Sequence, residues 1–346
     1  MARIVFADDG IAFDGRTPET RPLGGVESSV VFLMEELAKR GHEVRVFNKC
    51  EAPLEHRGVT WTPIDRGLPA AADLYIANRG HRLINAMPKA GKTLFWTHNP
   101  CRYMLKWRYL KELWKVRPGI IFIGEYHATT LPDWVPDGGR MVIPYGIPDL
   151  FRAAEPAHDL PPPRAVFTSN PLRSLGWLLD LWALAIQPKV PGAELHLFTG
   201  AATYGAVGDA KAREMEAVLD QARALADRGV VLRGPVPKTQ LVEEFRQARC
   251  MLYRGDINET FCLAVGEPQA MGLPAVVSDL GSMYERVVDG ETGFVARTDD
   301  AFAAGAVRLL SDDALWRQQH AAALERQRAW GWPEAAAAFE SWIPGA

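Results

Sequence analysis

The chain of 346 residues has few cysteines, little net charge and no long apolar segment. Its four cysteines form no CxxC pair and no cluster with histidine, which argues against a zinc site and favours reduced thiols. A formal net charge of −3 argues against a dedicated nucleic-acid-binding protein, which normally carries a basic excess. No run of about 18 apolar residues suits a membrane span, and the first residues show no signal-peptide pattern. We therefore expect a cytoplasmic protein.

Short apolar runs alternate with longer amphipathic segments along the whole chain, a pattern typical of α/β folds. Several runs are apolar on both faces, as in the strands of a buried parallel sheet. The expected strands are Arg3–Ala7, Glu43–Phe47, Asp73–Ala77, Lys92–Thr97, Ile120–Gly124 and Arg140–Ile143, then Ala165–Thr168, Glu194–Phe198, Val230–Arg233, Cys250–Tyr253, Ala275–Ser278 and Gly293–Ala296. The expected helices include Glu27–Arg40, Asp209–Asp227 and Lys238–Ala248.

A proline-rich stretch separates two series of such elements, which predicts two doubly wound, Rossmann-like domains facing a central cleft. The first domain is expected over residues 1–148, the linker over 149–163 and the second domain over 164–328, with a C-terminal helix at 329–346 completing the first domain. Parallel sheets of this kind bind ligands at the carboxyl ends of their strands. The cleft is therefore the expected active site.

Two adjacent glycines, Gly24 and Gly25, precede the first long helix. Glycine lets the backbone approach a ligand closely, and the free N–H groups at a helix start favour an anion. An ordinary loop before a helix explains the pair equally well. The dinucleotide pattern GxGxxG is absent here, which counts against a nicotinamide-dependent dehydrogenase.

Two carboxylates, Glu259 and Glu267, are separated by seven residues in ETFCLAVGE. If Glu259 precedes a helix and Glu267 lies about two turns inside it, both side chains can face the cleft. The spacing suits two separated hydroxyl-bearing parts of one ligand. A carboxylate embedded in an apolar run also needs a partner, because burying an unpaired charge is costly. The alternative is a solvated helix face.

The chain resembles the retaining glycosyltransferases of family 4, which have the GT-B fold. The resemblance is carried by GGVESSVVFLMEELAKRGHEVRVF, FWTHNP, VIPYGIPDLF, the Glu-x7-Glu element, QAMGLPAVVSD and VVDGETGFVA, in that order. It implies transfer of a sugar from a nucleoside-diphosphate sugar, with retained anomeric configuration, without a metal and without a further cofactor. By analogy the acceptor is a glycan or glycolipid in cell-surface polysaccharide synthesis.

The resemblance also implies roles for single residues in donor binding. Glu267 would bind the ribose hydroxyls, Glu259 would contact the donor sugar, and His98 would lie near the reacting sugar as the catalytic histidine of the cleft. The backbone after Glu259 would supply N–H groups to the sugar and diphosphate, through Thr260, Phe261, Cys262 and Leu263. Gly24 and Gly25 would lie against the leaving diphosphate or the acceptor.

The diphosphate site departs from the family pattern. Arg173 fits the position of the family's lysine, but the basic residue expected upstream of it is missing, and residues 167–170 stand in its place. Arg173 can bind phosphate bidentately, and the hydroxyl of Ser169 is a candidate helper. Cys262 stands where the family commonly has glycine, which would narrow the donor-sugar pocket. No Asp-x-Asp element suited to Mg²⁺ is present.

Residues 102–117 contain six basic residues and one acidic residue, interleaved with tryptophan and tyrosine. A basic amphipathic helix with tryptophan can lie on an anionic membrane surface at the inner face of the membrane. Tyr103, Trp107, Leu110 and Trp114 would share one face of this helix. A helix that packs on its own domain and presents a solvated basic face is the favoured interpretation.

Two other functions fit the same fold. One is another GT-B activity, such as an epimerase or a synthase acting on a sugar phosphate. The other is a catalytically silent protein that binds a sugar nucleotide or acts as a scaffold, which the altered diphosphate site supports. The sequence does not identify the nucleobase, the sugar or the acceptor.

Overall fold

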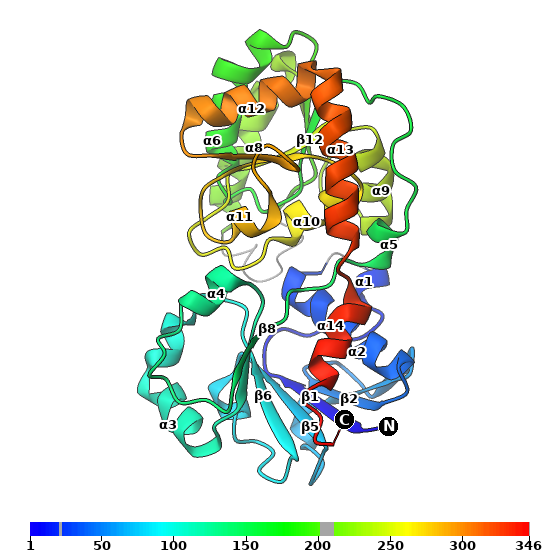
Figure 1. Cartoon of the computed structure of the whole chain (residues 1–346), viewed down its shortest axis with the longest axis vertical. Helices are drawn as coiled ribbons and strands as arrows, with labels where there is room; N and C mark the ends of the chain where they lie inside the picture. Colours follow the sequence, from blue (N-terminus) through cyan, green and yellow to red (C-terminus); the bar gives the residue numbers. More distant parts are fainter. Residues whose placement is uncertain (21–22, 201–210, 346) are drawn as a thin grey trace. The chain divides into compact units, whose positions relative to one another are not determined.

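The computed structural model describes residues 1–20, 23–200 and 211–345 and divides into two compact units (Figure 1). Unit 1 consists of residues 1–20, 25–146 and 332–345, and unit 2 consists of residues 23–24, 147–200 and 211–331. Each unit is built on one sheet with helices connecting its strands. The expectation of an α/β fold with two Rossmann-like parts is confirmed.

The sheet of unit 1 has the strand order β3-β4-β2-β1-β5-β6-β7-β8, parallel throughout except for the β3–β4 pair. Its strands are β1 (Arg3–Asp8), β2 (Glu43–Asn48), β3 (Leu54–His56), β4 (Val59–Pro63), β5 (Leu74–Asn78), β6 (Lys92–Trp96), β7 (Gly119–Phe122) and β8 (Arg140–Val142). Its helices are α1 (Thr17–Thr20), α2 (Gly25–Lys39), α3 (Trp107–Val116), α4 (Glu125–Thr129) and α14 (Trp332–Glu340), with 3-10 turns η1 (Ile64–Arg66), η2 (His81–Leu83) and η3 (Cys101–Leu105).

The sheet of unit 2 is parallel throughout, with the order β11-β10-β9-β12-β13-β14. Its strands are β9 (Arg164–Phe167), β10 (Glu194–Leu197), β11 (Val230–Leu232), β12 (Cys250–Tyr253), β13 (Ala275–Ser278) and β14 (Gly293–Ala296). Its described helices are α5 (Asp149–Arg152), α6 (Leu175–Leu181), η4 (Trp182–Ile186), η5 (Gln187–Lys189), α8 (Ala212–Ala224), η7 (Ala226–Arg228), α9 (Lys238–Arg246), α10 (Leu263–Ala270), α11 (Met283–Arg286), α12 (Asp299–Ser311) and α13 (Asp313–Arg328). The strand order reverses between β9 and β12, so the ligand crevice of such a sheet lies at their carboxyl ends.

The expected strands are all present, with ends that differ by one or two residues. The expected helix Asp209–Asp227 is shorter in the described part of the chain: α8 ends at Ala224, a 3-10 turn follows, and residues 209–210 lie outside the described residues. The stretch expected to be a linker contains the short helix α5.

The hairpin β3–β4 was not expected. Its two-residue turn, Arg57-Gly58, has positive φ at both positions (47° and 76°), as in a type I′ turn. Glycine tolerates this conformation, whereas arginine rarely adopts it, so the turn carries no clear sequence signal. The hairpin extends the sheet of unit 1 beyond β2.

The C-terminal helix α14 lies against α2 within unit 1 (Figure 1). Glu340 at its end accepts hydrogen bonds from Arg40 Nε and Nη2, both at 2.7 Å, in a bidentate ion pair. His42 Nε2 lies 2.7 Å from the same carboxylate. These contacts tie together residues that are about 300 positions apart in sequence. Among the described residues, no helix combines the length and apolar character needed to cross a bilayer.

His127 on α4 is buried, and both of its ring nitrogens have hydrogen-bond partners. The Ile123 N–H donates to Nδ1 at 3.2 Å, so Nε2 carries the proton and donates to the Asn99 carbonyl at 2.9 Å. Burial lowers the pKa of His127 to about 4. The folded protein therefore holds a neutral ring that protonates only well below its ordinary pKa.

The His127→Gln variant tests this assignment through the pH dependence of stability. The unfolded chain binds the proton near pH 6.5, whereas the folded chain binds it near pH 4, so the stabilisation is present above pH 6.5 and is lost as the pH falls toward 4. We expect the difference in unfolding free energy between wild type and His127→Gln to shrink by about 3 kcal/mol over this range. Urea denaturation at several pH values measures it, and parallel pH profiles would contradict the assignment.

Candidate functional site

The carboxyl ends of β9 and β12 bring a cation and a carboxylate together in unit 2. Arg173, in the loop after β9, places Nη1 3.4 Å from Glu259 Oε2 and 3.8 Å from Asp256 Oδ1. The Tyr253 hydroxyl donates to the same Glu259 oxygen at 3.0 Å. Burial raises the pKa of Glu259, while Arg173 and Tyr253 act in the opposite direction. Arg173 is 43% exposed, so it can reach an anionic ligand while it holds Glu259 in place.

A close backbone approach at Gly281 fixes the loop that carries Glu259. A Cβ at Gly281 would lie 2.5 Å from the Asp256 carbonyl oxygen and 2.7 Å from the Glu259 carbonyl oxygen, and φ is +56°. The Ser282 N–H donates to the Glu259 carbonyl at 3.0 Å. Only glycine meets both the space and the conformation that this contact requires.

Glu267 is buried in α10, with 6% of its surface exposed. The sequence predicted a position about two turns inside the helix. Glu267 instead lies four residues after Leu263, where the helix begins, which is about one turn inside it. The helix begins later than expected because Cys262 adopts a left-handed conformation, with φ of 70°. The partner that this buried carboxylate requires is Lys238, whose Nζ forms an ion pair with Glu267 Oε1.

Lys238 is the first residue of α9 and follows Pro237, which precedes the helix. Its Nζ also lies 5.9 Å from the centre of the Phe151 ring. Lys238 was not predicted as a site residue, because no local pattern pairs two residues that are 29 positions apart. Because a buried carboxylate needs a partner, the sequence predicted that Glu267 is paired, but it did not identify the cation.

The backbone between Glu259 and α10 is buried at Thr260, Phe261 and Cys262, and Leu263 is the first residue of the helix. Arg286 places its guanidinium 4.2 Å from the centre of the Phe261 ring, and its Nε is buried without a hydrogen-bond partner in the described part of the chain. Burial lowers the pKa of Arg286. This second cation beside the loop was not recognised in the sequence.

Ser169, in the loop after β9, joins the same group of residues. Its side chain hydrogen-bonds Tyr253, and its carbonyl accepts a hydrogen bond from Thr199. Burial raises the pKa of Tyr253 far above its ordinary value, so this tyrosine stays protonated and donates to Glu259. Ser169 therefore contributes to the support of Glu259 in the ligand-free protein.

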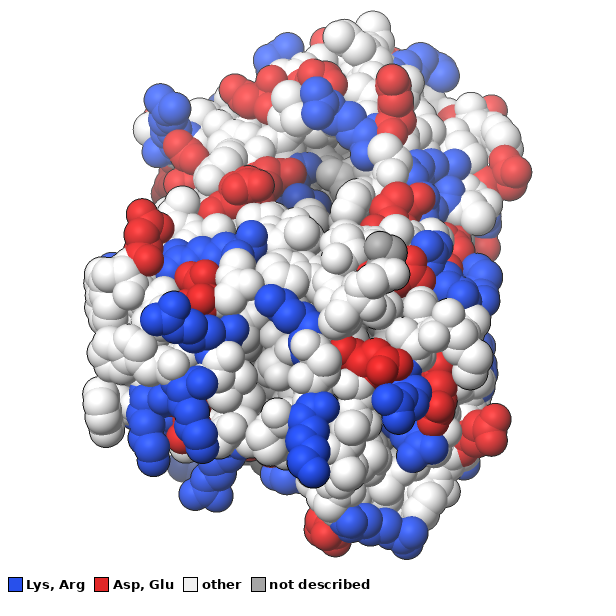
Figure 2. All heavy atoms as spheres, turned by 60° about the horizontal axis from the view of Figure 1, so that its bottom comes forward, with Lys and Arg blue, Asp and Glu red and all other residues white. Residues whose placement is uncertain are grey.

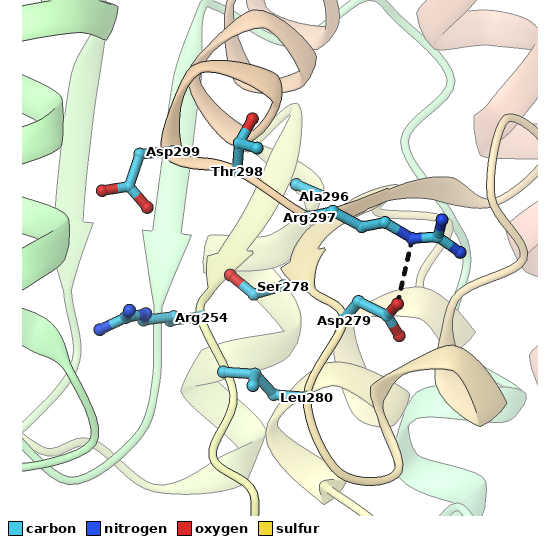
Figure 3. Close-up of a pocket in the computed structure, with 8 residues that line it drawn as sticks. All are labelled: Arg254, Ser278, Asp279, Leu280, Ala296, Arg297, Thr298 and Asp299. Carbon is cyan, nitrogen blue, oxygen red and sulfur yellow. Dashed lines mark hydrogen bonds and ion pairs between the residues drawn. The ribbon is translucent and has the colours of Figure 1, made fainter.

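A pocket of about 210 Å³ opens at the carboxyl ends of β12, β13 and β14 (Figure 3). It is lined by Arg254, Ser278, Asp279, Leu280, Ala296, Arg297, Thr298 and Asp299. Arg254 lies on one side with its guanidinium 4.7 Å from the Trp177 ring centre, and Arg297 pairs with Asp279 on the other at 3.3 Å. Arg254 is on the same loop as Glu259, so the pocket borders the group around Arg173.

A second polar cluster lies at the carboxyl ends of β1 and β5 in unit 1. Asp8 at the end of β1 is fully buried, and it accepts hydrogen bonds from Asn78 Nδ2 at 3.1 Å and from Arg79 Nη2 at 3.1 Å. The same Arg79 nitrogen lies 3.0 Å from Glu27 Oε1 on α2. Burial raises the pKa of Asp8, and Arg79 opposes this effect. One guanidinium thus compensates two carboxylates.

His98, after β6, lies beside this cluster. Its Nε2 is 2.5 Å from Asn78 Oδ1, its Nδ1 is 2.5 Å from the Tyr145 hydroxyl, and its ring is buried. Burial and, to a smaller extent, the positive charge of Arg79 lower the pKa of His98 well below its ordinary value. The ring is therefore neutral at physiological pH.

Gly25 is the first residue of α2 and Gly24 precedes it, and neither has a described contact that assigns it a ligand.

Among the residues that the structure describes, no three or more His, Cys, Asp and Glu side chains gather into a possible metal site. Transfer without a metal stays a prediction. So do the roles of the site residues.

Comparison with known proteins finds a family that unit 2 resembles. Residues 166–312 match the family model described as glycosyl transferases group 1. The similarity to the glycosyl transferases group 1 family is carried by this segment, which is less than half of the chain. The matched residues run from β9 to the end of α12 and contain both Glu259 and Glu267.

Curated relatives match this chain over shorter segments. The D-inositol 3-phosphate glycosyltransferase of Streptomyces avermitilis is 37% identical over 111 residues, which is 32% of this chain and 24% of the relative. That of Xylanimonas cellulosilytica is 35% identical over 129 residues, which is 37% of this chain and 30% of the relative. The chain thus spans about a quarter to a third of the length of these two relatives.

Solved structures match nearly the whole chain and show the GT-B fold. Sucrose-phosphate synthase from Thermosynechococcus elongatus has a TM-score of 0.72 at 18% identity and covers 98% of each chain. Trehalose-6-phosphate synthase OtsA has a TM-score of 0.75 at 12% identity and covers 99% of each chain. The chain therefore has two Rossmann-like domains of the GT-B type, as the sequence predicted.

Proposed function

We propose that this protein is a retaining, metal-independent glycosyltransferase that moves a sugar from a nucleoside-diphosphate sugar to a glycan or lipid-linked acceptor in cell-surface polysaccharide synthesis. The observation that carries the proposal is the arrangement of Arg173, Glu259, Lys238 and Glu267 at the carboxyl edge of the unit 2 sheet. Each of the two carboxylates, the half-buried Glu259 and the buried Glu267, is held by a cation that an anionic ligand can attract. The names of the relatives, which are glycosyltransferases, support this class of reaction.

In this proposal Glu267 accepts hydrogen bonds from the ribose hydroxyls and Glu259 contacts hydroxyls of the donor sugar. Charge builds on the diphosphate as it leaves, and fixed cations or N–H groups must stabilise it. Arg173 and the N–H groups at the start of α10, from Cys262 to Leu263, supply that stabilisation. Lys238 and Arg286 are the cations available in place of the missing upstream basic residue.

His98 acts near the reacting sugar as a neutral hydrogen-bonding group, because its lowered pKa excludes a standing positive charge. Contact with the sugar requires His98 to exchange its hydrogen bond to Tyr145 or Asn78 for one to the substrate. Gly24 and Gly25 line the diphosphate or acceptor side, where the absence of side chains gives the ligand room. Ser169 releases Tyr253 when the diphosphate binds. Cys262 narrows the donor-sugar pocket.

A second candidate keeps the donor chemistry and replaces the acceptor. The names of the relatives and structural neighbours describe transfer to, or synthesis of, phosphorylated small molecules: D-inositol 3-phosphate glycosyltransferase, sucrose-phosphate synthase and trehalose-6-phosphate synthase. They favour a sugar phosphate or cyclitol phosphate as the alternative acceptor. A silent scaffold is the remaining alternative, and it predicts binding without turnover.

A thermal-shift screen tests the donor part of the proposal. The purified protein is heated with UDP, GDP, ADP, CMP and TDP sugars without added metal, because a ligand that binds only the folded state raises the melting temperature. We expect one nucleotide class to give a clear shift. That donor is then offered with glycan, lipid-linked and sugar-phosphate acceptors, and the configuration of the product is read by NMR. No shift with any donor, or inversion at the anomeric carbon, would contradict the proposal.

The Glu267→Gln variant tests the ribose contact. Hydrogen bonds to a charged group contribute about 1.5–3 kcal/mol, so donor affinity should fall by about 10- to 150-fold while kcat changes little. Titration calorimetry with the identified donor measures the loss. Glu243→Gln is the matched control, because Glu243 on α9 is 66% exposed and pairs only with Arg246 among the described residues. Equal affinity of Glu267→Gln and Glu243→Gln would contradict the assignment.

A further inference from the structure

Helix α3 in unit 1 uses two different faces for two different environments. Tyr109 and Leu113 are buried in the core of the unit, and the Tyr109 hydroxyl donates to the Arg79 carbonyl at 3.2 Å. Trp107 and Trp114, seven positions apart, point away from that core, with 68% and 50% of their surfaces exposed. The favoured prediction, a helix that packs on its own domain and presents a basic face, is confirmed for residues 107–116. Tyr109 and Leu113 provide the packing face, whereas Trp107 and Trp114 stay exposed.

The exposed residues of the segment 102–117 are all basic or tryptophan. They are Arg102, Lys106, Trp107, Arg108, Lys111, Trp114, Lys115 and Arg117. The single acid, Glu112, is half-buried and lies 3.9 Å from Lys111. The neighbouring turn η2 adds the exposed Arg82. We call this set of exposed residues the Trp–basic face.

The two tryptophans lie together at the centre of this face. Their ring centres are 6.1 Å apart, in an edge-to-face arrangement. At 100° per residue, Lys111, Lys115 and Arg108 flank them on the same side of α3. Figure 2 shows several Lys and Arg side chains on the left of the face that it presents, among uncharged side chains and a few acidic ones.

We propose that the Trp–basic face binds an anionic lipid bilayer surface. Tryptophan rings favour the headgroup region of a bilayer, where their apolar body and N–H group are both accommodated. Basic side chains around them are attracted to anionic headgroups. Two large apolar side chains that lie together on an exposed helix face indicate a surface that binds a partner. The positive charge around them favours a negatively charged partner and disfavours a second copy of the same basic face. Only the purpose of this binding, which is to bring the transferase to a lipid-linked acceptor, rests on the proposed function.

Vesicle sedimentation tests the proposal with the full chain. The protein should sediment with vesicles of phosphatidylglycerol mixed equally with phosphatidylcholine, and not with phosphatidylcholine alone. Binding should weaken strongly from about 0.1 M to about 1 M salt, because the screening length falls from about 10 Å to about 3 Å. Equal binding to both vesicle types, or no binding to either at low salt, would overturn the proposal.

Two double variants separate charge from tryptophan insertion. Each lysine lost should lower the partition coefficient about fivefold, so Lys111→Glu/Lys115→Glu should bind at least about 25-fold more weakly. Trp107→Ser/Trp114→Ser should also bind more weakly, while keeping its salt dependence. Matched controls are Lys189→Glu/Arg317→Glu and Leu184→Ser in unit 2, all at exposed positions, and they should bind as wild type does.

Circular dichroism confirms that each variant is folded before its binding is compared. Loss of vesicle binding in both α3 variants, and not in the controls, supports the proposal. Unchanged binding in the α3 variants would overturn it. So would binding of wild type to a soluble polyanion such as dextran sulfate but not to anionic vesicles, since the partner would then be a polyanion. Sedimentation needs no sugar transfer, so failure of the proposed function is distinguishable from failure of this inference.

Discussion

Replacing Arg173 with alanine is expected to lower kcat by about 10²- to 10³-fold, the loss typical of removing one preorganised donor to a developing negative charge. Arg173 is also one of the groups that hold Glu259, at 3.4 Å, so the donor KM should rise as well. Initial rates with the donor found by thermal shift measure both effects. The stability should change little, because the side chain is 43% exposed.

Two further variants sharpen the Arg173 experiment. Arg173→Lys keeps the positive charge and should recover part of the rate, but not the bidentate geometry that a guanidinium offers to a phosphate. Arg297→Ala removes an arginine whose side chain is 86% exposed at the edge of the pocket in Figure 3 and should leave the rate unchanged. If Arg173→Ala retained the wild-type rate, Arg173 would not bind the leaving diphosphate.

Replacing Arg79 with alanine is expected to lower the free energy of unfolding by about 3–5 kcal/mol. The substitution leaves Asp8, which is fully buried, and Glu27, whose side chain is 9% exposed, without the guanidinium that neutralises them. An uncompensated buried charge accounts for most of the loss. Urea denaturation measures it through the midpoint at constant m-value.

The Arg79 assignment has an internal control. Asp8→Asn in the Arg79→Ala background removes the buried charge but keeps an oxygen for the Asn78 hydrogen bond, so much of the stability should return. Asp8→Asn alone should destabilise less than Arg79→Ala. If the double variant were no more stable than Arg79→Ala, the cost would come from lost packing and not from the unpaired carboxylate.

Several features of this protein follow from local sequence alone. Buried parallel strands need residues that are apolar on both faces, as in Ala275–Ser278. All the strands except β3 and β4 of the hairpin could therefore be predicted. The order of those elements predicted two Rossmann-like domains. The Glu259 and Glu267 motif and the position of Arg173 after a strand were also readable, because strand ends and helix starts are local features.

The partners of these residues were decided by the tertiary structure. Lys238 meets Glu267 because the loop after β11 and the helix after β12 end at the same edge of the sheet, and no local pattern relates two residues 29 positions apart. The same holds for Arg79, which compensates Asp8 from 71 positions away. A sequence states that a buried charge needs a partner, whereas the fold selects which partner is near.

The orientation of α3 shows the same division. The sequence predicted an amphipathic basic helix over residues 102–117, since charged and apolar side chains recur at helical spacing. The structure instead has a 3-10 turn over Cys101–Leu105 and helix α3 over Trp107–Val116, because Lys106 between them is extended. Its aromatic residues occupy both sides of that helix, so periodicity could not decide which of them are buried. Packing against the core of unit 1 selected Tyr109 and Leu113, and the two tryptophans were left exposed because a helix can bury only one face against one sheet.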